Sequence, residues 1–492
     1  MPDNSEPERA AATGLKVRKR SAVPGSGDGS PEQVHLTWGE DPATSVVVSW
    51  ASAGRARGPR VRIGQRIFGA EERAYTDAVS GETVWTYHAR VAGLRPGATY
   101  GYAVTAENDR GSGDPFSETF TTAPAGRKKF RFTSFGDLAG ARMAWPLSYP
   151  EASYAVGAVE SFQPLFHLLN GDLCDDDLNP AAWRDFGTNC QASASNRPWM
   201  PVLGNHGTGF YDGPHGFSAY LTRYTLPDNG VPAFTGRWYS FRIGSALFVA
   251  LDANDVAHGH SRGAQTRWLA RTLERARRDA SVDWIIAQTH QCACSPSADA
   301  AWIRSRWLPL FDRYEVDLVL GGHGRGYERS YPVRGFDRAS VPPASGSASG
   351  SASGSAALAG AYRPRPVTTA DSGVFDTSQG TVHLTLGSGR APGAVPAQPA
   401  GPGGAAGSRA GEAGARPAWS ARRDTSAAYG IAVFDVDPGT ESGGHTSVTV
   451  TRYHAADGVP DGDYNEFETF TLVRPRSDRR RWHAREGAAV PV

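Results

Sequence analysis

Cysteine and methionine are scarce in this chain of 492 residues, which contains four cysteines and three methionines. Four cysteines are too few for a disulfide-rich scaffold, although an even number permits two bridges in three pairings. Cys292 and Cys294 are separated by one residue and no second cysteine pair accompanies them, which makes a poor zinc site. We therefore expect Cys174, Cys190, Cys292 and Cys294 to be free thiols.

A charge excess of either sign is also missing. The chain has 51 Lys and Arg against 50 Asp and Glu, so its formal net charge is +1. This balance produces no overall field that would favour nucleic acid or an acidic membrane surface, and we predict neither as a partner. No stretch approaches about 18 consecutive apolar residues, which excludes a spanning helix. The composition therefore predicts a soluble globular protein.

At about 150 residues per domain, the length predicts two to four units. Residues 1–30 combine a basic run with a Gly/Ser/Pro-rich stretch and lack an apolar segment, so we expect a disordered tail without an export signal. Residues 342–361 and 390–416 are low in complexity and are predicted to be flexible inserts. The basic segment 476–492 is predicted to be a solvated terminus.

Residues 31–124 contain short β-rich runs, such as 34–38 and 45–50, without a helical period. Such spacing predicts a small β-sandwich. The pattern that begins Leu-x-Pro-Gly at Leu94 and continues through Tyr100 resembles fibronectin type III modules, in which the tyrosine holds a strand corner. No residue of this region suggests chemistry, so we interpret it as a packing or docking unit.

Residues 128–475 have a different pattern, in which hydrophobic runs end abruptly at glycine and polar residues. Residues 265–278 have helical spacing, with Trp268, Leu269 and Leu273 on one face. Strands that alternate with helices predict an α/β layered domain whose ligands cluster where the strands end. Further β-rich runs after residue 381 are expected to complete its sheets.

Residue types that bind metals follow five of these hydrophobic runs, and most lie beside a glycine. In chain order they are Asp137, Asp172, Asn205 with His206, His290 and His323. Each one alone is more often a turn cap or a structural hydrogen-bonding group. Strand ends can bring such side chains to one rim, and glycine permits the close backbone approach that a shared site needs. The set therefore predicts a metal site.

These motifs, together with Pro198–His206 and Tyr327–Pro332, resemble the metallophosphoesterases and specifically the purple acid phosphatases. A sandwich followed by such a domain is also the architecture of that family. The resemblance implies an α/β fold, with a fibronectin type III-like sandwich followed by a four-layer αββα metallophosphoesterase domain. It implies hydrolysis of phosphate monoesters of small molecules by metal-activated water.

The resemblance also implies a role for each motif residue. Asp172 would bridge two metal ions, and Asp137 would bind the first, which is normally ferric. The second, divalent site would suit Zn, Mn or Fe and would be completed by Asn205, His290 and His323. His206 would lie near the leaving-group oxygen, as an electrostatic stabiliser or a proton donor.

Two positions depart from the family pattern, and both belong to the first metal site. Asp175 replaces the iron-binding tyrosine and could still be a ligand, but without the charge transfer that colours the family. Arg325 replaces a histidine and cannot bind a metal because its guanidinium stays protonated.

Three outcomes stay open for this altered site. The first site could be rebuilt around Asp137, Asp172 and Asp175, with Asp176 or Asp177. A single metal could act with Arg325, which would grip the phosphate as a bidentate fork. The protein could also be a weak or inactive relative that acts as a binding protein. We therefore expect one or two metal ions.

The segment after His290 also lacks the histidines that contact substrate in the plant enzymes. His258 and His260 are alternatives, but we expect both to be solvated loop histidines. The resemblance suggests export, although no signal peptide is visible. The sequence makes no prediction of oligomeric state.

Overall fold

The computed structural model describes residues 29–77, 80–108, 111–138, 150–174, 180–205, 217–295, 300–337, 363–387, 417–424, 429–456, 463–480 and 482. Both predicted inserts and nearly all of the predicted N-terminal tail lie outside these ranges. Within them, no helix is both long and apolar enough to cross a membrane.

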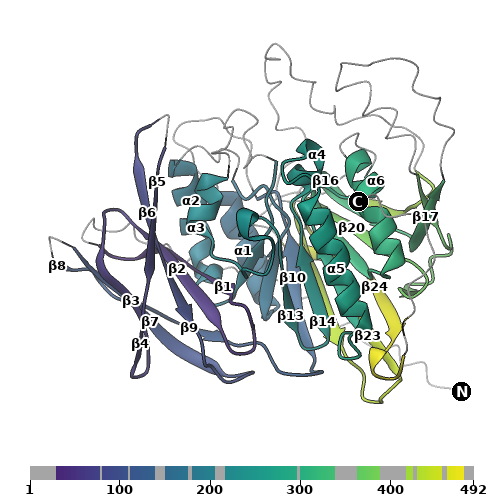
Figure 1. Cartoon of the computed structure of the whole chain (residues 1–492), viewed down its shortest axis with the longest axis horizontal. Helices are drawn as coiled ribbons and strands as arrows, with labels where there is room; N and C mark the ends of the chain where they lie inside the picture. The colour runs from purple at the N-terminus through teal and green to yellow at the C-terminus, as the bar shows by residue number, and fades with distance from the viewer. Residues whose placement is uncertain are drawn as a thin grey trace, which may run out of the picture.

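The N-terminal region is a sandwich of two antiparallel sheets (Figure 1). One sheet contains β1 (Glu32–Trp38), β2 (Val46–Ser52), β6 (Thr83–Val91) and β5 (Glu71–Thr76). The other contains β4 (Arg66–Gly69), β3 (Arg57–Ile63), β7 (Thr99–Asn108), β8 (Gly111–Ser112) and β9 (Phe116–Thr121). Trp50 and Tyr87 are fully buried between them. The Tyr100 hydroxyl accepts a hydrogen bond from the backbone N–H of Arg95 at 2.8 Å, as the corner motif predicts. The predicted β-sandwich is confirmed.

The second region is built on two large sheets. The seven-stranded sheet runs in the order β12 (Trp199–Pro201), β11 (Phe166–Leu169), β10 (Phe130–Phe135), β22 (Gly430–Asp437), β23 (His445–Ala455), β24 (Tyr464–Pro475) and β19 (Val374–Asp376). The six-stranded sheet contains β13 (Tyr239–Ile243), β14 (Ala246–Ala250), β15 (Trp284–Gln288), β16 (Leu318–Ser330) and β20 (Val382–Gly387), with β21 (Ser420–Asp424) beside β16. Outside both sheets, β17 (Val333–Asp337) pairs with β18 (Arg363–Pro366).

Aromatic side chains join the inner faces of the two large sheets. Phe132 on β10 meets Phe248 on β14 edge-on, with ring centroids 5.3 Å apart. Phe166 and Phe241 make a similar contact at 5.7 Å. These rings belong to one continuous buried core, so the two sheets pack face to face.

Helices cover both outer faces of the paired sheets (Figure 1). The seven-stranded sheet carries α1 (Pro150–Ser161) and α2 (Pro180–Ala194), and the six-stranded sheet carries α4 (Ala253–His258), α5 (Ala264–Arg278) and α6 (Ala300–Arg313). Short helices α3 (Ser218–Arg223), η3 (Pro232–Phe234) and η5 (Ser477–Arg479) complete the described set. In α5 the predicted face of Trp268, Leu269 and Leu273 is buried. The helix–sheet–sheet–helix layering confirms the predicted α/β class.

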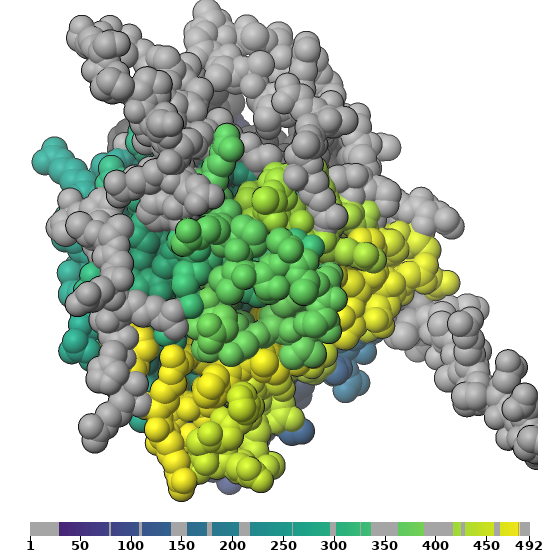
Figure 2. All heavy atoms as spheres, turned by 90° about the vertical axis from the view of Figure 1, so that its right-hand side faces the viewer, coloured from purple at the N-terminus to yellow at the C-terminus, as the bar shows by residue number. Residues whose placement is uncertain are grey.

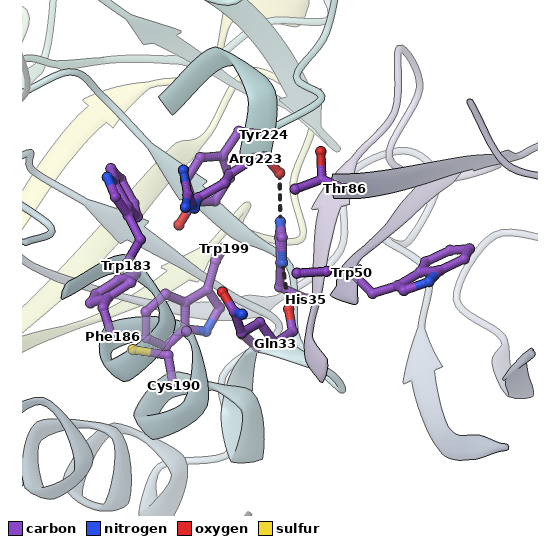
Figure 3. Close-up of a pocket in the computed structure, with 13 residues that line it drawn as sticks. Gln33, His35, Trp50, Thr86, Trp183, Phe186, Cys190, Trp199, Arg223 and Tyr224 are labelled. Carbon is purple, nitrogen blue, oxygen red and sulfur yellow. Dashed lines mark hydrogen bonds between the residues drawn. The ribbon is translucent and has the colours of Figure 1, made fainter. Parts of the chain in front are cut away.

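The sandwich is held to the second domain by side-chain hydrogen bonds to backbone carbonyls. Imidazole nitrogens of His35 and His88 lie 3.0 Å and 2.9 Å from the carbonyl oxygens of Arg223 and Thr222. Figure 3 shows the His35–Arg223 contact beside a gap lined by Trp183 and other aromatic residues. This gap encloses about 30 Å³, room for only a few water molecules, so we interpret it as an interface space.

Within the predicted C-terminal tail, Arg476 is 9% exposed, so the beginning of this segment packs against the domain. Arg474, just before the tail at the end of β24, is 1% exposed and binds the buried carboxylate of Asp317. Arg480 lies 3.0 Å from Glu315, which is also buried. The reason is electrostatic, because two buried carboxylates require cations nearby. Figure 2 shows the yellow C-terminal strands bordering green segments from the middle of the chain.

Candidate metal centre

Most of the residues predicted to bind metal follow strands that end at one edge of the paired sheets, and His323 lies within β16 at the same edge. Strands β10 and β11 are parallel, and Phe135 pairs with Leu169 just before Asp137 and Asp172. Strands β15 and β16 are also parallel, with Gln288 opposite Leu320, and His290 and His323 follow. Because parallel strands share a carboxyl edge, four distant parts of the sequence meet there.

Four of the predicted ligands converge on one point. Ligand atoms of Asp172, His290 and His323 all lie within 4.8 Å of one another. Oδ1 of Asn205 lies 2.8 Å from Nε2 of His290 and 2.8 Å from Nδ1 of His323. Oδ2 of Asp172 is 3.1 Å from the same Nε2 of His290. Two imidazoles, an amide oxygen and a carboxylate therefore surround one small volume.

Asp137 lies beside this group, on the His323 side. Its two carboxylate oxygens accept the backbone N–H of His323 at 3.2 Å and 3.0 Å. The carboxylate is thereby held at the start of the turn that carries His323.

His290 has the tautomer that a metal ligand needs. Its Nδ1 lies 2.7 Å from the backbone carbonyl of Asn170, which only accepts, so Nδ1 carries a proton. In neutral imidazole, Nε2 then presents a lone pair toward the oxygens of Asn205 and Asp172. Electron-rich atoms in such an arrangement repel one another unless a proton or a cation lies among them. The N/O donor set and the carbonyl behind the imidazole both fit a divalent transition metal.

The pKa values of His290 and Asp137 also indicate that positive charge is stabilised at this centre. Burial alone lowers the pKa of His290, but the Asp172 carboxylate outweighs it and raises that pKa to about 9. Burial raises the pKa of Asp137 to about 6, with His290 opposing the shift and Asp172 adding to it. Protons held here occupy the place that a cation would take.

The backbone at this edge is strained. Asp137, Asp172 and His323 have φ angles of 54°, 48° and 63°, in the left-handed region that costs a non-glycine residue roughly 1–3 kcal/mol. Neighbouring glycines leave the necessary space, since a Cβ on Gly322 would lie 2.6 Å from Oδ2 of Asp137. A Cβ on Gly171 would lie 2.6 Å from Nδ1 of His290. The glycines beside the motif residues are therefore required by close packing, as the sequence predicts.

Supporting residues that the sequence analysis did not identify surround the centre. Asn170 contributes its carbonyl to His290, and its side chain exchanges hydrogen bonds with Ser134 at 2.9–3.2 Å. Asn254 donates to the carbonyl of Gly204 at 3.0 Å, next to Asn205. Asn170 precedes a Gly-Asp motif, which is a usable signal, whereas nothing in the sequence around Asn254 marks it.

Two predicted site residues, Asp175 and His206, lie outside what the structure describes, as does the side chain of Arg325. His258 ends α4 and is therefore not a loop residue as expected, and its side chain is not described. His260 is exposed, as expected, and its ring is 6.3 Å from that of Phe217.

All four cysteines are buried free thiols, as expected. Burial raises the pKa of Cys292 to about 12, which keeps this thiol protonated near the centre.

This fold, with carboxylate, amide and imidazole groups gathered at the strand ends, defines a hydrolase of the metallophosphoesterase class. Residues 31–123 match the family "Purple acid Phosphatase, N-terminal domain", and residues 130–324 match "Calcineurin-like phosphoesterase". The chain belongs to the purple acid phosphatase family of metallophosphoesterases, which confirms the resemblance. Membership implies phosphoester hydrolysis at a dinuclear metal centre.

Individual relatives agree with this membership. The uncharacterized protein Rv2577 of Mycobacterium tuberculosis is 37% identical over 93% of this chain and 89% of its own length. Purple acid phosphatase 21 of Arabidopsis thaliana is 27% identical, over 54% of this chain and 60% of its own. Among solved structures, purple acid phosphatase PPD1 from yellow lupin has a TM-score of 0.64 at 18% identity, covering 92% of this chain and 75% of that one. This last likeness concerns the fold.

Proposed function

We propose that this protein hydrolyses phosphate monoesters of small molecules, and that Asp172, Asn205, His290 and His323 hold a divalent metal ion. The observation that carries this proposal is the orientation of His290, whose proton on Nδ1 faces the Asn170 carbonyl while Nε2 faces Asn205 and Asp172. Bound metal ions would supply a hydroxide at moderate pH and neutralise the charge of the phosphate.

The same proposal assigns the other metal position to Asp137, Asp172 and Asp175. A carboxylate at Asp175 replaces the family's tyrosine with a harder oxygen donor, so the protein would be colourless. Support comes from the surroundings of Asp137, since a Cβ on Gly387 would lie 2.8 Å from its Oδ2. Gly387 pairs with the backbone of Arg325, so the backbone of residue 325 also lies near Asp137.

Two residues of this chain are proposed to act on the substrate. Arg325 binds two phosphate oxygens through its guanidinium fork, in place of the family's histidine ligand. His206, which directly follows Asn205, donates a proton to the leaving-group oxygen.

The test measures hydrolysis of p-nitrophenyl phosphate by protein reloaded with iron, zinc or manganese. We expect Asp172→Asn to lower kcat/KM at least about 100-fold. Asp114→Asn, at an exposed position of the sandwich, should stay within about twofold of the wild type. Equal rates in the wild type and Asp172→Asn would contradict the proposal.

Metal content per chain tests the first site separately. About two equivalents would support Asp175 as a ligand. One equivalent would instead indicate that the Arg325 guanidinium supplies the positive charge that a metal ion would provide at the first site. No bound metal would favour the alternative, a binding protein that keeps the fold without the activity.

A further inference from the structure

A carboxylate–imidazole pair lies at the same edge of the large sheets as the metal centre. Nδ1 of His454, near the end of β23, is 2.9 Å from Oδ2 of Asp424, the last residue of β21. The Asp424 side chain is 4% exposed and that of His454 is 25% exposed. Because a carboxylate accepts, Nδ1 donates, and Nε2 is directed away from Asp424. Within the described ranges, Nε2 of His454 has no hydrogen-bond partner.

Strand register places His454 relative to the metal centre. Ser134 on β10 pairs with Ala432 on β22. Extending this antiparallel register two residues beyond the last printed pair leads from Ser134 to Gly136, which precedes Asp137, and from Ala432 to Gly430. Gly430 pairs in turn with His454 on β23. Neighbouring strands are about 4.8 Å apart, so His454 lies about 10 Å along the edge from Gly136.

The partner carboxylate comes from the opposite sheet. Asp424 pairs with Tyr327 on β16, four residues after His323. The His454–Asp424 pair therefore bridges the two sheets beside the metal centre.

A bulge in β24 brings an aromatic ring to the same place. Arg452 pairs with Glu468 and Tyr453 with Glu466, which leaves Phe467 as the extra residue. Bulges often redirect a side chain next to a functional site. The ring centroid of Phe467 is 5.5 Å from that of His454, and the Arg422 guanidinium lies 5.0 Å over the same ring.

The charged groups around Phe467 favour an anion. Arg422 is exposed, and Arg452 is fully buried with its guanidinium 5.3 Å from the Tyr327 ring. The carboxylate of Glu468 is already bound by Arg329 at 3.0 Å. An exposed guanidinium and an oriented imidazole thus flank one aromatic ring, about two strand spacings from the metal centre.

We propose that His454, held by Asp424, and Arg422 form a subsite for a second anionic group of the substrate. This inference rests on the proposed function and names its substrate class: phosphate esters whose leaving group carries another phosphate about 10 Å away, as in a hexose phosphorylated at both ends. Asp424 acts as a positioning residue that orients the imidazole. Arg422 supplies the charge and His454 a directional hydrogen bond.

The test compares hydrolysis of a hexose bisphosphate with that of the matching hexose monophosphate. We expect His454→Asn and Arg422→Ser to lower kcat/KM for the bisphosphate about tenfold, mainly through KM, and to leave the monophosphate within about twofold. Matched controls are His445→Asn, at the other end of β23, and Arg423→Ser, on the opposite face of β21. Equal losses with both substrates, or no loss, would overturn the subsite.

A binding measurement separates this inference from the proposed function. Metal-free protein is titrated calorimetrically with the hexose bisphosphate, and Arg422→Ser should bind it about tenfold more weakly than Arg423→Ser does. If this difference appears in a protein without phosphatase activity, the subsite stands and the proposed function fails. If activity is present but both variants bind alike, the subsite fails alone.

Discussion

The backbone carbonyl oxygen of Asn170 lies 2.7 Å from Nδ1 of His290, and this contact couples two strand ends of different sheets. Asn170 follows β11, which leads into Asp172, whereas His290 follows β15. The same turn therefore contributes one candidate ligand and orients another. A ligand held in one tautomer by a second group binds its metal more tightly than a free imidazole does.

Replacing His290 tests whether this orientation serves a metal ion. We expect His290→Gln to lose about one equivalent of bound metal per chain and at least about 100-fold in kcat/KM, since the lone pair of Nε2 is removed. Metal analysis and the p-nitrophenyl phosphate assay measure both effects. His445→Gln, at an exposed histidine, is the control. Unchanged metal content in His290→Gln would exclude His290 as a ligand.

Removing metal is expected to destabilise the fold, because three residues at this edge are held in strained backbone conformations. A ligand present at about 100 times its dissociation constant stabilises the native state by about 2.7 kcal/mol. A chelator should therefore lower the free energy of unfolding, measured in urea, by about this amount. Asn205→Ala should respond much less, and an equal response in that variant would contradict the assignment of Asn205.

Glu160 on α1 is expected to make stability dependent on acid. Its carboxylate accepts hydrogen bonds from Ser193 at 2.6 Å and Arg197 at 2.7 Å and lies 3.0 Å from Nε2 of His167. Burial raises the pKa of Glu160, but His167 and Arg197 outweigh it and lower that pKa from 4.5 to about 2. A folded-state pKa below the unfolded value means that stabilisation is complete above pH 4.5 and is lost as the pH falls toward 2.

The matching variant is Glu160→Gln. We expect it to lose at most about 3 kcal/mol of unfolding free energy at pH 7, with a difference from the wild type that shrinks below pH 4.5. Urea titrations at several pH values measure this, and Glu441→Gln, at an exposed position, is the control. A difference that stays constant down to pH 3 would show that Glu160 acts through packing alone.

His88 tests the contact between the two domains. Its Nε2 lies 2.9 Å from the carbonyl oxygen of Thr222 and its Nδ1 2.8 Å from the Ser49 hydroxyl, and the ring is buried. His88→Leu would leave the carbonyl of Thr222 with one partner fewer, at a cost of about 1–3 kcal/mol in unfolding free energy. Calorimetry of the wild type should show one unfolding transition, since this contact joins the sandwich to α3 of the second domain. Two separate transitions in the wild type would contradict a rigid docking.

Much of the candidate site was predictable because its signals are local. A hydrophobic run followed by glycine and a ligand-type residue predicts where a strand ends and what it presents, as for Asp137 and Asp172. The carbonyl of Asn170 was not predictable, since every residue has a carbonyl and only packing decides which one meets His290. His454 and Asp424 lie on strands of different sheets, which come together only because the two sheets pack face to face. No sequence motif predicts this pair.

The start of the basic C-terminus was predicted less well. The composition of residues 476–492 predicts a solvated tail, yet Arg476 is buried and Arg480 pairs with Glu315. Composition reports the charge of a segment but not whether buried carboxylates elsewhere need that charge.

By itself, the sequence determined the kinds of structural layer, the order of the ligand-type residues and the strand ends that carry them, because periodicity and glycine placement are properties of neighbouring residues. Only the tertiary structure decided that Asp172, Asn205, His290 and His323 share one point, and that His454 and Asp424 meet beside it. The physical reason is that distances between remote residues depend on strand register and on how two sheets pack. Both are determined by interactions throughout the chain and not by neighbouring residues alone.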